Sequence, residues 1–249
     1  MRSHDGSLSI GLIGGMSWES TVPYYRVINE TVREQRGGLH SARIVLYSVD
    51  FHDVEAMQRT GRWSAAGDAL AQAAVALEGA GADFLVLCTN TMHKVAAAIE
   101  RAVRIPLLHI ADPTADAVKA ARVHTVGLLG TRFTMEEDFY CERLRARHGL
   151  DVVVPDAADR DAVHRIIYDE LCMGQVVESS RARYRSIVER LVARGAAGII
   201  LGCTEISMLL GPADASVPTF DTTLIHARAA ALRAMAAVDR PATCEEPSP

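Results

Sequence analysis

The two halves of this chain carry the same series of segments, and this internal similarity restricts the possible folds more than any other feature. In the first half, IGLIGGMSWES is followed by GADFLVLCTNTMH and then by IPLLHIADPTADAVKAA. In the second half, VGLLGTRFTMEED is followed by GAAGIILGCTEIS and then by VPTFDTTLIHARAAA. Each series holds a strand ending in a glycine turn, a strand ending in a polar cluster, and a proline-led strand entering an alanine-rich helix. The repeat predicts two lobes related by pseudosymmetry.

Short apolar segments alternate with helical patterns along the chain, which is typical of parallel sheets connected by helices. We therefore expect an α/β fold with two pseudo-symmetric lobes, each a parallel sheet flanked by helices. Lobe 1 is predicted to comprise residues 1–112 and 221–249, and lobe 2 residues 113–220. The clearest helical patterns cover 64–79 and 179–194, and the polar tail after Asp239 is expected to be disordered. Strands are predicted at 9–13, 42–48, 84–88, 107–110, 125–129, 152–154, 198–201 and 219–220.

Composition excludes several classes of protein. The 249 residues are 49% hydrophobic, enough for a core in each lobe. A net charge of -5, with acidic and basic residues interspersed, argues against nucleic acid as a partner. No signal peptide or long apolar run is visible, so we expect a cytoplasmic protein with no membrane contact. The five cysteines include no C-x-x-C pair, so free thiols and no metal site are expected.

Polar clusters follow one strand in each half, LCTNTMH in the first and LGCTE in the second. Ligands of open α/β sheets bind at the carboxyl ends of strands, so both clusters are expected to face a cleft between the lobes. Two such clusters on opposite faces of one carbon suit proton removal and return, which is racemisation or epimerisation. A thiol at a helix N-terminus has a lowered pKa and can act as base and acid, which favours Cys203. Taken alone, Cys203 is better explained as a small buried apolar residue, but the repeat favours the acid/base role.

The motifs GLIGGMS, GAD-strand-TNTMH, LLGT and GAAGIILGCTE together resemble the aspartate/glutamate racemase family, from Ile10 to about Ala236. The resemblance implies an amino-acid racemase that uses no pyridoxal phosphate or other cofactor and forms a homodimer. It also implies an acidic amino acid, aspartate or glutamate, as the substrate. The sequence contains no G-x-G-x-x-G or G-K-[ST] motif and no lysine in a recognisable pyridoxal context, in agreement with this expectation.

The family has a cysteine before Asn-Thr in the first lobe and a cysteine before Thr-Glu in the second. The second position is Cys203, whereas the first is Thr89, because Cys88 lies one residue too early. Successive strand residues point in opposite directions, so Cys88 should face the core and Thr89 the cleft. A hydroxyl is a far weaker acid than a thiol, so Thr89 would hold water or relay a proton. The resemblance implies that Cys203 deprotonates the L enantiomer and Thr89 supports the opposite face.

The remaining predicted site residues follow from position and resemblance. Gln58 is predicted to lie in a loop, where it would reach a substrate carboxylate, and Arg59 and Arg62 of the same loop are charged alternatives. An equally weighted interpretation is that this loop is only a solvated connection between helices. His52 and His93 are interpreted as ordinary polar or structural residues. Turn residues expected to line the cleft are Met16, Ser17 and Thr131, and residues expected to hold the α-carboxylate and ammonium are Asn90, Thr91, Thr204 and Glu205.

One departure from the resemblance concerns the side-chain carboxylate. Related aspartate racemases carry a lysine one turn after a tyrosine in the segment that matches IIYDELCMG. The tyrosine is present as Tyr168, but the lysine position falls on Cys172. Cys172 is interpreted as a helix-packing residue with no catalytic role.

Two other functions stay open at this point. The same scaffold with one cysteine would serve a small-dicarboxylate isomerase or decarboxylase of the maleate isomerase type, since protonating one face of an enolate needs one good acid. A two-lobed cleft would also serve a non-catalytic protein that binds an amino acid. A reactive thiol facing the cleft distinguishes the enzymes from the binding protein.

Overall fold

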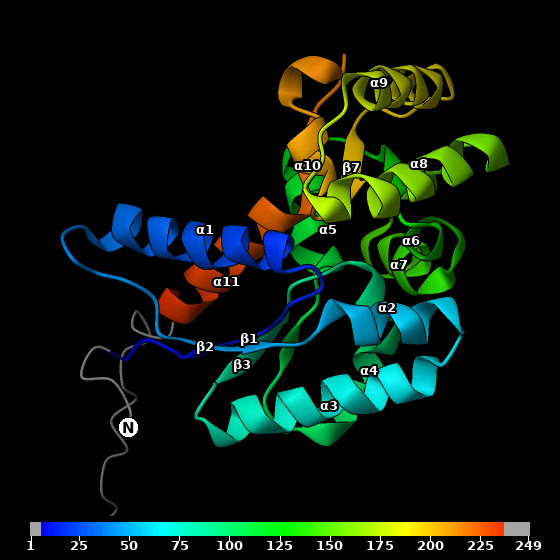
Figure 1. The fold of residues 1–249 in the computed structure, drawn as a ribbon. Helices are drawn as coiled ribbons and strands as arrows, with labels where there is room; N and C mark the ends of the chain where they lie inside the picture. The colour runs from blue at the N-terminus through cyan, green and yellow to red at the C-terminus, as the bar shows by residue number, and fades with distance from the viewer. Residues whose placement is uncertain (1–5, 237–249) are drawn as a thin grey trace, which may run out of the picture.

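The computed structural model describes residues 6–236, which form two parallel four-stranded sheets flanked by helices (Figure 1). The strand order is β2-β1-β3-β4 in the first sheet and β6-β5-β7-β8 in the second. The expected α/β fold is confirmed, and a strand occurs at each of the eight predicted places. The bounds are β1 Ile10–Gly14, β2 Ile44–Ser48, β3 Phe84–Leu87, β4 Leu107–Leu108, β5 Thr125–Gly130, β6 Asp151–Val153, β7 Ile199–Gly202 and β8 Thr219–Asp221.

The sequence repeat explains why the two sheets have the same order. The glycine-turn segments form the central strands β1 and β5, and the segments with polar ends form their neighbours β3 and β7. All five residues of β1 and all four of β3 and of β7 are buried, as expected for strands covered on both faces. Gly15 turns the chain after β1 with φ +89°, and a Cβ there would lie 2.2 Å from the Val49 carbonyl oxygen. Only glycine fits this turn.

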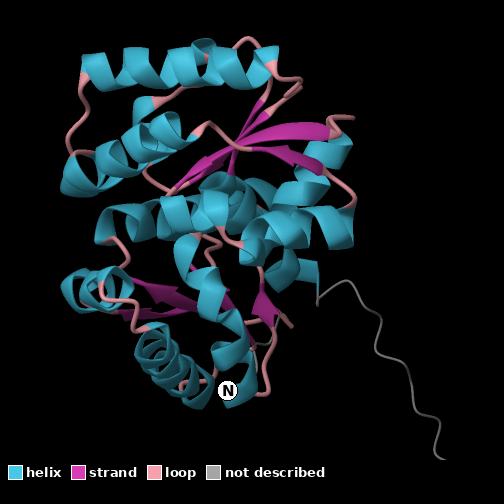
Figure 2. Cartoon of the chain, turned by 90° about the vertical axis from the view of Figure 1, so that its right-hand side faces the viewer, coloured by secondary structure: helices cyan, strands magenta, loops and turns pink. Residues whose placement is uncertain are grey.

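Helices cover both faces of each sheet, and the two sheets are separate (Figure 2). Ser17 begins α1 by accepting a hydrogen bond from the Ser20 N–H, and Gly37 ends it. The predicted helix at 64–79 is α3. The helices that follow the first four strands are α1 Trp18–Arg36, α2 Phe51–Arg59, α3 Trp63–Gly79, α4 Ala96–Ala102 and α5 Ala111–Ala120, with a 3-10 turn η1 at Thr91–Val95.

The second half is built from shorter helices around the second sheet. The predicted helix at 179–194 is α9, and α8 lies beside it (Figure 1). The bounds are α6 Arg132–Glu136, α7 Asp138–Glu142, α8 Ala157–Asp169, α9 Glu178–Ala193, α10 Ile206–Leu209 and α11 Thr222–Ala236, with a π-helical turn η2 at Arg143–Arg147 and 3-10 turns η3 at Leu171–Met173 and η4 at Pro212–Asp214.

Two helices connect the lobes, because each packs against the sheet of the other lobe and not against the sheet that contains the preceding strand. Ala111 and Ala115 of α5 belong to the core cluster of the second sheet, although α5 follows β4 of the first. Ala227 and Ala231 of α11 belong to the core under the first sheet, together with Tyr24 of α1. Figure 1 shows α1 and α11 side by side. The boundaries predicted for the two lobes stay a prediction.

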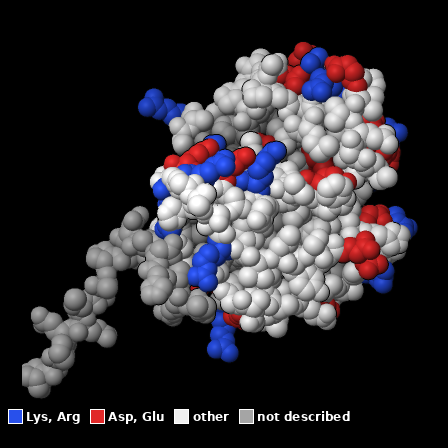
Figure 3. All heavy atoms as spheres, turned by 60° about the vertical axis from the view of Figure 1, so that its left-hand side comes forward, with Lys and Arg blue, Asp and Glu red and all other residues white. Residues whose placement is uncertain are grey.

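Acidic and basic side chains are interspersed on the face drawn in Figure 3, where they stand among large areas of other residues. Among residues 6–236, no helix combines the length and the apolar character needed to cross a bilayer. The tail after Asp239, for which we expect disorder, lies outside the described residues.

Candidate active site

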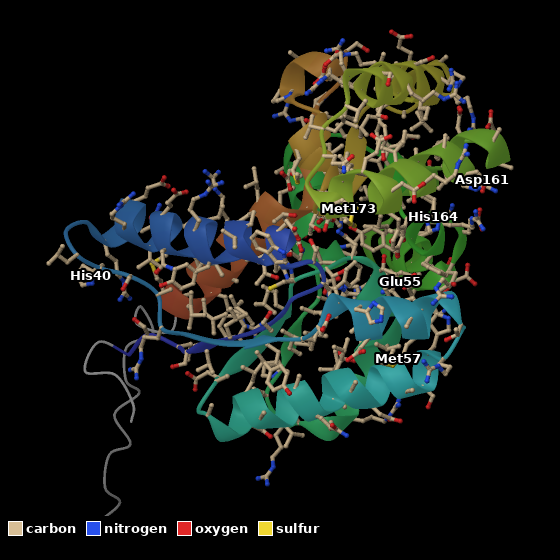
Figure 4. All side chains as sticks on the ribbon, viewed as in Figure 1. His40, Glu55, Met57, Asp161, His164 and Met173 are labelled. Carbon is tan, nitrogen blue, oxygen red and sulfur yellow. The ribbon has the colours of Figure 1, made fainter. Side chains whose placement is uncertain are left out.

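A small pocket with a cavity volume of about 20 Å³ lies between the two sheets, at the carboxyl ends of their central strands. The strand-end residues of β3 and β7 approach it from the two lobes, and α2 and α8 flank it. Figure 4 shows Glu55 on the side of α2 that faces His164 of α8, and Met57 on the opposite side, toward α3. This volume holds about one water molecule, so binding of an amino acid requires the lining side chains to move apart. The lining residues are Met16, Phe51, Gln58, Thr89, Asn90, Thr91, Thr131, Ile167, Tyr168, Cys172, Gly202, Cys203, Thr204 and Glu205.

Nine of the ten predicted site residues are therefore brought together around one pocket, although they come from five separate segments of the chain. Ser17 is the tenth, and it does not line the pocket. It lies at the start of α1, where its hydroxyl donates a hydrogen bond to Glu205 Oε1 at 2.8 Å. Ser17 therefore acts on the pocket through Glu205.

Cys203 follows β7 and is 8% exposed. Its thiol donates a hydrogen bond to Glu205 Oε2 at 3.0 Å. Burial and the neighbouring Glu205 carboxylate raise the pKa of the Cys203 thiol well above its ordinary value. The prediction that a helix N-terminus lowers this pKa is wrong, because α10 after Cys203 has only four residues and the carboxylate is adjacent. In the free structure Cys203 is a thiol.

Glu205 is the hub of the second-lobe cluster. Its carboxylate is 3% exposed and accepts hydrogen bonds from Thr204 Oγ1 at 2.6 Å and from the Cys203 thiol on one oxygen. The other oxygen accepts from Ser17 of the first lobe. Among the described residues, no lysine, arginine or histidine is recorded as an ion-pair partner of this carboxylate within 4.0 Å. A buried carboxylate served only by neutral donors is suited to receive a cation such as an ammonium group.

Thr89 faces the pocket from the end of β3, whereas Cys88 is fully buried in the first-lobe core. This alternation confirms the predicted orientation of the two neighbours. Burial raises the pKa of the Cys88 thiol, as it does for Cys203, but Cys88 does not line the pocket and so has no access to a substrate. Of these two thiols, Cys203 is therefore the one placed for the predicted chemistry.

His93 holds the Thr89 backbone in place. Its Nδ1 lies 2.8 Å from the Thr89 carbonyl oxygen, and its Nε2 accepts from the Ile110 N–H at 3.2 Å. A carbonyl only accepts and an N–H only donates, so these two bonds fix the neutral tautomer with hydrogen on Nδ1. Burial and the neighbouring rings of His109 and His226 lower the pKa of His93, in agreement with the structural role predicted for it.

The amide of Asn90, which lines the pocket, is oriented by its contact with the start of α11. The Thr222 hydroxyl donates to the Leu201 carbonyl at 2.8 Å, so its oxygen accepts from Asn90 Nδ2 at 3.0 Å. This orientation leaves Asn90 Oδ1 buried and without a hydrogen-bond partner. The unpartnered acceptor needs a donor, which a substrate ammonium would supply.

Hydroxyl groups join the lobes on another side of the pocket. Thr91 Oγ1 of the first lobe lies 2.9 Å from Thr131 Oγ1 of the second, and Thr134 Oγ1 lies 3.2 Å from Thr131 Oγ1. Thr131 also caps α6. Since each hydroxyl can donate or accept, this group can rearrange around one carboxylate.

Gln58 lies in the last turn of α2 and not in the predicted loop; it lines the pocket, but its amide is already engaged. Gln58 Oε1 accepts from the Tyr168 hydroxyl at 2.9 Å, and Gln58 Nε2 donates to Met92 Sδ at 3.0 Å. The alternatives Arg59 and Arg62 do not line the pocket. Arg59 forms an ion pair with Glu55 and is largely exposed.

Cys172 packs against the second-lobe core, as predicted, and it also lines the pocket. Sequence reasoning also did not place Phe51, Ile167 or Gly202 there. Ile167 lies on the apolar face of α8, and no local signal shows that this face covers a site in addition to a core. Within residues 6–236, no group of three His, Cys, Asp or Glu side chains is placed to hold a metal ion.

The chain is similar to known proteins over nearly its whole length. The family model described as Asp/Glu/Hydantoin racemase matches residues 13–230. A protein from Yersinia pestis, provisionally assigned as an Asp/Glu racemase, has a solved structure with 57% sequence identity and a TM-score of 0.86, covering 92% of this chain and 99% of that one. An aspartate racemase homologue from Pyrococcus horikoshii OT3 shows 35% identity and a TM-score of 0.78, with 91% and 98% covered. The broad specificity amino-acid racemase RacX of Bacillus subtilis (strain 168) is 24% identical over 229 residues, which cover 88% of this chain and 95% of RacX.

Proposed function

Because this chain belongs to the Asp/Glu/hydantoin racemase family, we propose that it racemises an amino acid with Cys203 as the main acid and base and Thr89 on the opposite face. This chain is a relative of amino-acid racemases, which are isomerases. The observation that carries the residue assignment is the placement of Cys203 and Thr89 at the carboxyl ends of β7 and β3, around one pocket between the lobes.

The mechanism follows from the charges around the thiol. In the free structure the Glu205 carboxylate helps to raise the pKa of the Cys203 thiol. A substrate ammonium placed between Glu205 and Asn90 Oδ1 would compensate this negative charge and lower the pKa of the Cys203 thiol, which gives up its proton to water as the thiolate forms. The thiolate then removes the α-proton from one face.

Return of a proton to the other face completes the inversion. Thr89 lies at the end of β3, and its hydroxyl would relay a proton through water rather than act as a strong base. The hydroxyl group formed by Thr91 and Thr131 is suited to hold the α-carboxylate, whose negative charge grows as the carbanion forms. The proposal requires no cofactor, because thiol and hydroxyl groups provide the proton transfers.

The names of the solved relatives favour aspartate and glutamate as candidate substrates.

We also propose that the chain acts as a homodimer. The outer face of α1 exposes Trp18, Val22 and Tyr25, which are spaced one helical turn apart and form an apolar stripe suited to a second copy. Light scattering coupled to gel filtration tests this, and a monomeric mass at all concentrations contradicts it.

The test of the racemase proposal is proton NMR in D2O, following the α-hydrogen signal and the chirality of L and D amino acids. Wild-type protein should exchange and racemise, and Cys203→Ala should lower both rates by at least about a hundredfold. Cys141→Ala is the matched control, since Cys141 lies in the second-lobe core and does not line the pocket. Thr89→Ala should retain exchange of the L enantiomer but lose inversion. Full exchange in Cys203→Ala refutes the assignment.

A further inference from the structure

The charge of the pocket is unusual for a site that would take a dicarboxylic amino acid. Among its described lining residues, Glu205 is the only acidic residue, and there is no lysine, arginine or histidine. The cations nearest in sequence to Gln58 are occupied elsewhere. Arg59 pairs with Glu55, and the Nε of Arg62 donates to Thr60 Oγ1. The pocket itself therefore carries no positive side chain.

The neutral groups that would replace a cation are also engaged. On the side formed by α2 and α8, the Tyr168 hydroxyl donates to Gln58, whose amide nitrogen donates to Met92 Sδ. On the side formed by η1 and α11, the Asn90 amide nitrogen donates to Thr222. Both polar amides thus present few free donors, and Asn90 presents a free acceptor.

The groups still available match the two charged parts that every α-amino acid has. Glu205 and Asn90 Oδ1 are acceptors for the ammonium, and the hydroxyls of Thr91 and Thr131 can serve the α-carboxylate. The long helix α1 places its positive N-terminus at Ser17, which is bonded to Glu205, so this end already stabilises the protein carboxylate. The N-terminus of α2, whose first residue Phe51 lines the pocket, is likewise capped by a protein carboxylate, because Asp50 accepts from the His52 N–H. Among the described lining residues, no cation remains for a second substrate carboxylate.

A side-chain carboxylate would therefore be buried without a partner, which is strongly unfavourable. An uncharged side chain meets no such penalty. The remaining lining includes Met16, Phe51, Ile167 and Cys172, which offer an apolar surface. Because RacX, which matches most of the chain, is named a broad specificity amino-acid racemase, selection for an acidic side chain is not general among the relatives.

Resting on the proposed racemisation, we infer that this site selects amino acids with uncharged side chains over aspartate and glutamate. The basis is a pocket that holds a buried carboxylate, an unpartnered acceptor and no cation. The sequence-based expectation of an acidic substrate would then describe relatives that place a lysine at the position of Cys172.

The test compares pairs of nearly equal shape that differ in charge: L-asparagine with L-aspartate and L-glutamine with L-glutamate, with L-methionine as an apolar substrate. The readout is kcat/KM for α-hydrogen exchange in D2O by the wild-type protein. We expect each amide to exceed its acid by at least about tenfold. Equal or faster exchange of the acids overturns the inference while the racemase proposal stands. Exchange of none of the five overturns the racemase proposal itself.

A second experiment restores the missing charge. Cys172→Lys should raise the ratio of kcat/KM for aspartate to that for asparagine by at least about tenfold, because a lysine there would face the side-chain carboxylate. Cys172→Met is the matched control, since it adds a side chain of similar length without charge, and its ratio should stay near that of the wild type. An unchanged ratio in a folded Cys172→Lys protein contradicts the placement of the substrate side chain beside Cys172.

Discussion

The hydrogen bond from Ser17 to Glu205 joins the two lobes at the pocket, and its removal tests the charge arrangement described above. In Ser17→Ala, Glu205 Oε1 loses the donor at 2.8 Å and stays buried. A hydrogen bond to a charged group contributes about 1.5–3 kcal/mol. The serine also caps α1, but its contact with the Ser20 N–H is long at 3.4 Å, so the cap adds about 0.5 kcal/mol, the low end of the usual range.

We therefore expect Ser17→Ala to lower the free energy of unfolding by about 2–3.5 kcal/mol, measured by urea denaturation. Ser17→Thr is the control that keeps a hydroxyl. A double-mutant cycle with Glu205→Gln separates the two roles of Ser17, because a neutral amide weakens the bond but leaves the cap unchanged. The loss caused by Ser17→Ala should be smaller by about 1 kcal/mol in the Glu205→Gln background. An equal loss in both backgrounds would show that Ser17 acts only as a cap and would refute the reasoning.

Three other outcomes follow from the same contacts. Glu205→Gln should lower the pKa of the Cys203 thiol, because it removes a carboxylate that raises this pKa. The ultraviolet absorbance of the thiolate is measured against pH, with a variant that also carries Cys203→Ala as the reference. An unchanged or higher midpoint contradicts the prediction. Gly15→Ala should cost several kcal/mol, on the order of 3 or more, in thermal unfolding, since a Cβ would lie 2.2 Å from the Val49 carbonyl oxygen at φ +89°; near-wild-type stability would show that the turn can open. The free energy of unfolding should be highest above about pH 6.5 and fall as the pH drops below it. Burial lowers the folded-state pKa of three histidines, so the unfolded chain takes up protons first. Urea denaturation at several pH values tests this, and a constant free energy of unfolding between pH 7 and about 5 contradicts it. These histidines are His93, His109, with a pKa of about 2, and His226, with a pKa of about 4.

Local patterns were sufficient to predict the secondary structure and the general place of the site. Strands such as β3 and β7 are short, apolar and followed directly by polar clusters, so each can be recognised within about ten residues. The repeat then required equal topology in the two halves, and parallel strands bring their carboxyl ends to one edge. Alternation along a strand also predicted that Cys88 faces the core and Thr89 the pocket.

The state of the site depends on contacts that no local pattern contains. Asn90 is oriented by Thr222, which lies 132 residues away, and Glu205 is bonded to Ser17, which lies 188 residues away. The engagement of Gln58 by Tyr168 across the lobes is of the same kind. Whether a polar atom is free or paired depends on which groups the fold brings near it, so the sequence could list these residues but not their hydrogen bonds.

Sequence alone thus determined the α/β class, the doubled topology and the residues that gather at the strand ends, because hydrophobic periodicity and strand direction act over short distances. The tertiary structure determined the chemical state of these residues. Burial beside Glu205 raises the pKa of the Cys203 thiol instead of lowering it, and the pocket encloses a carboxylate without a cation. Both are properties of a desolvated space between two lobes, where each charge depends on the few partners within reach.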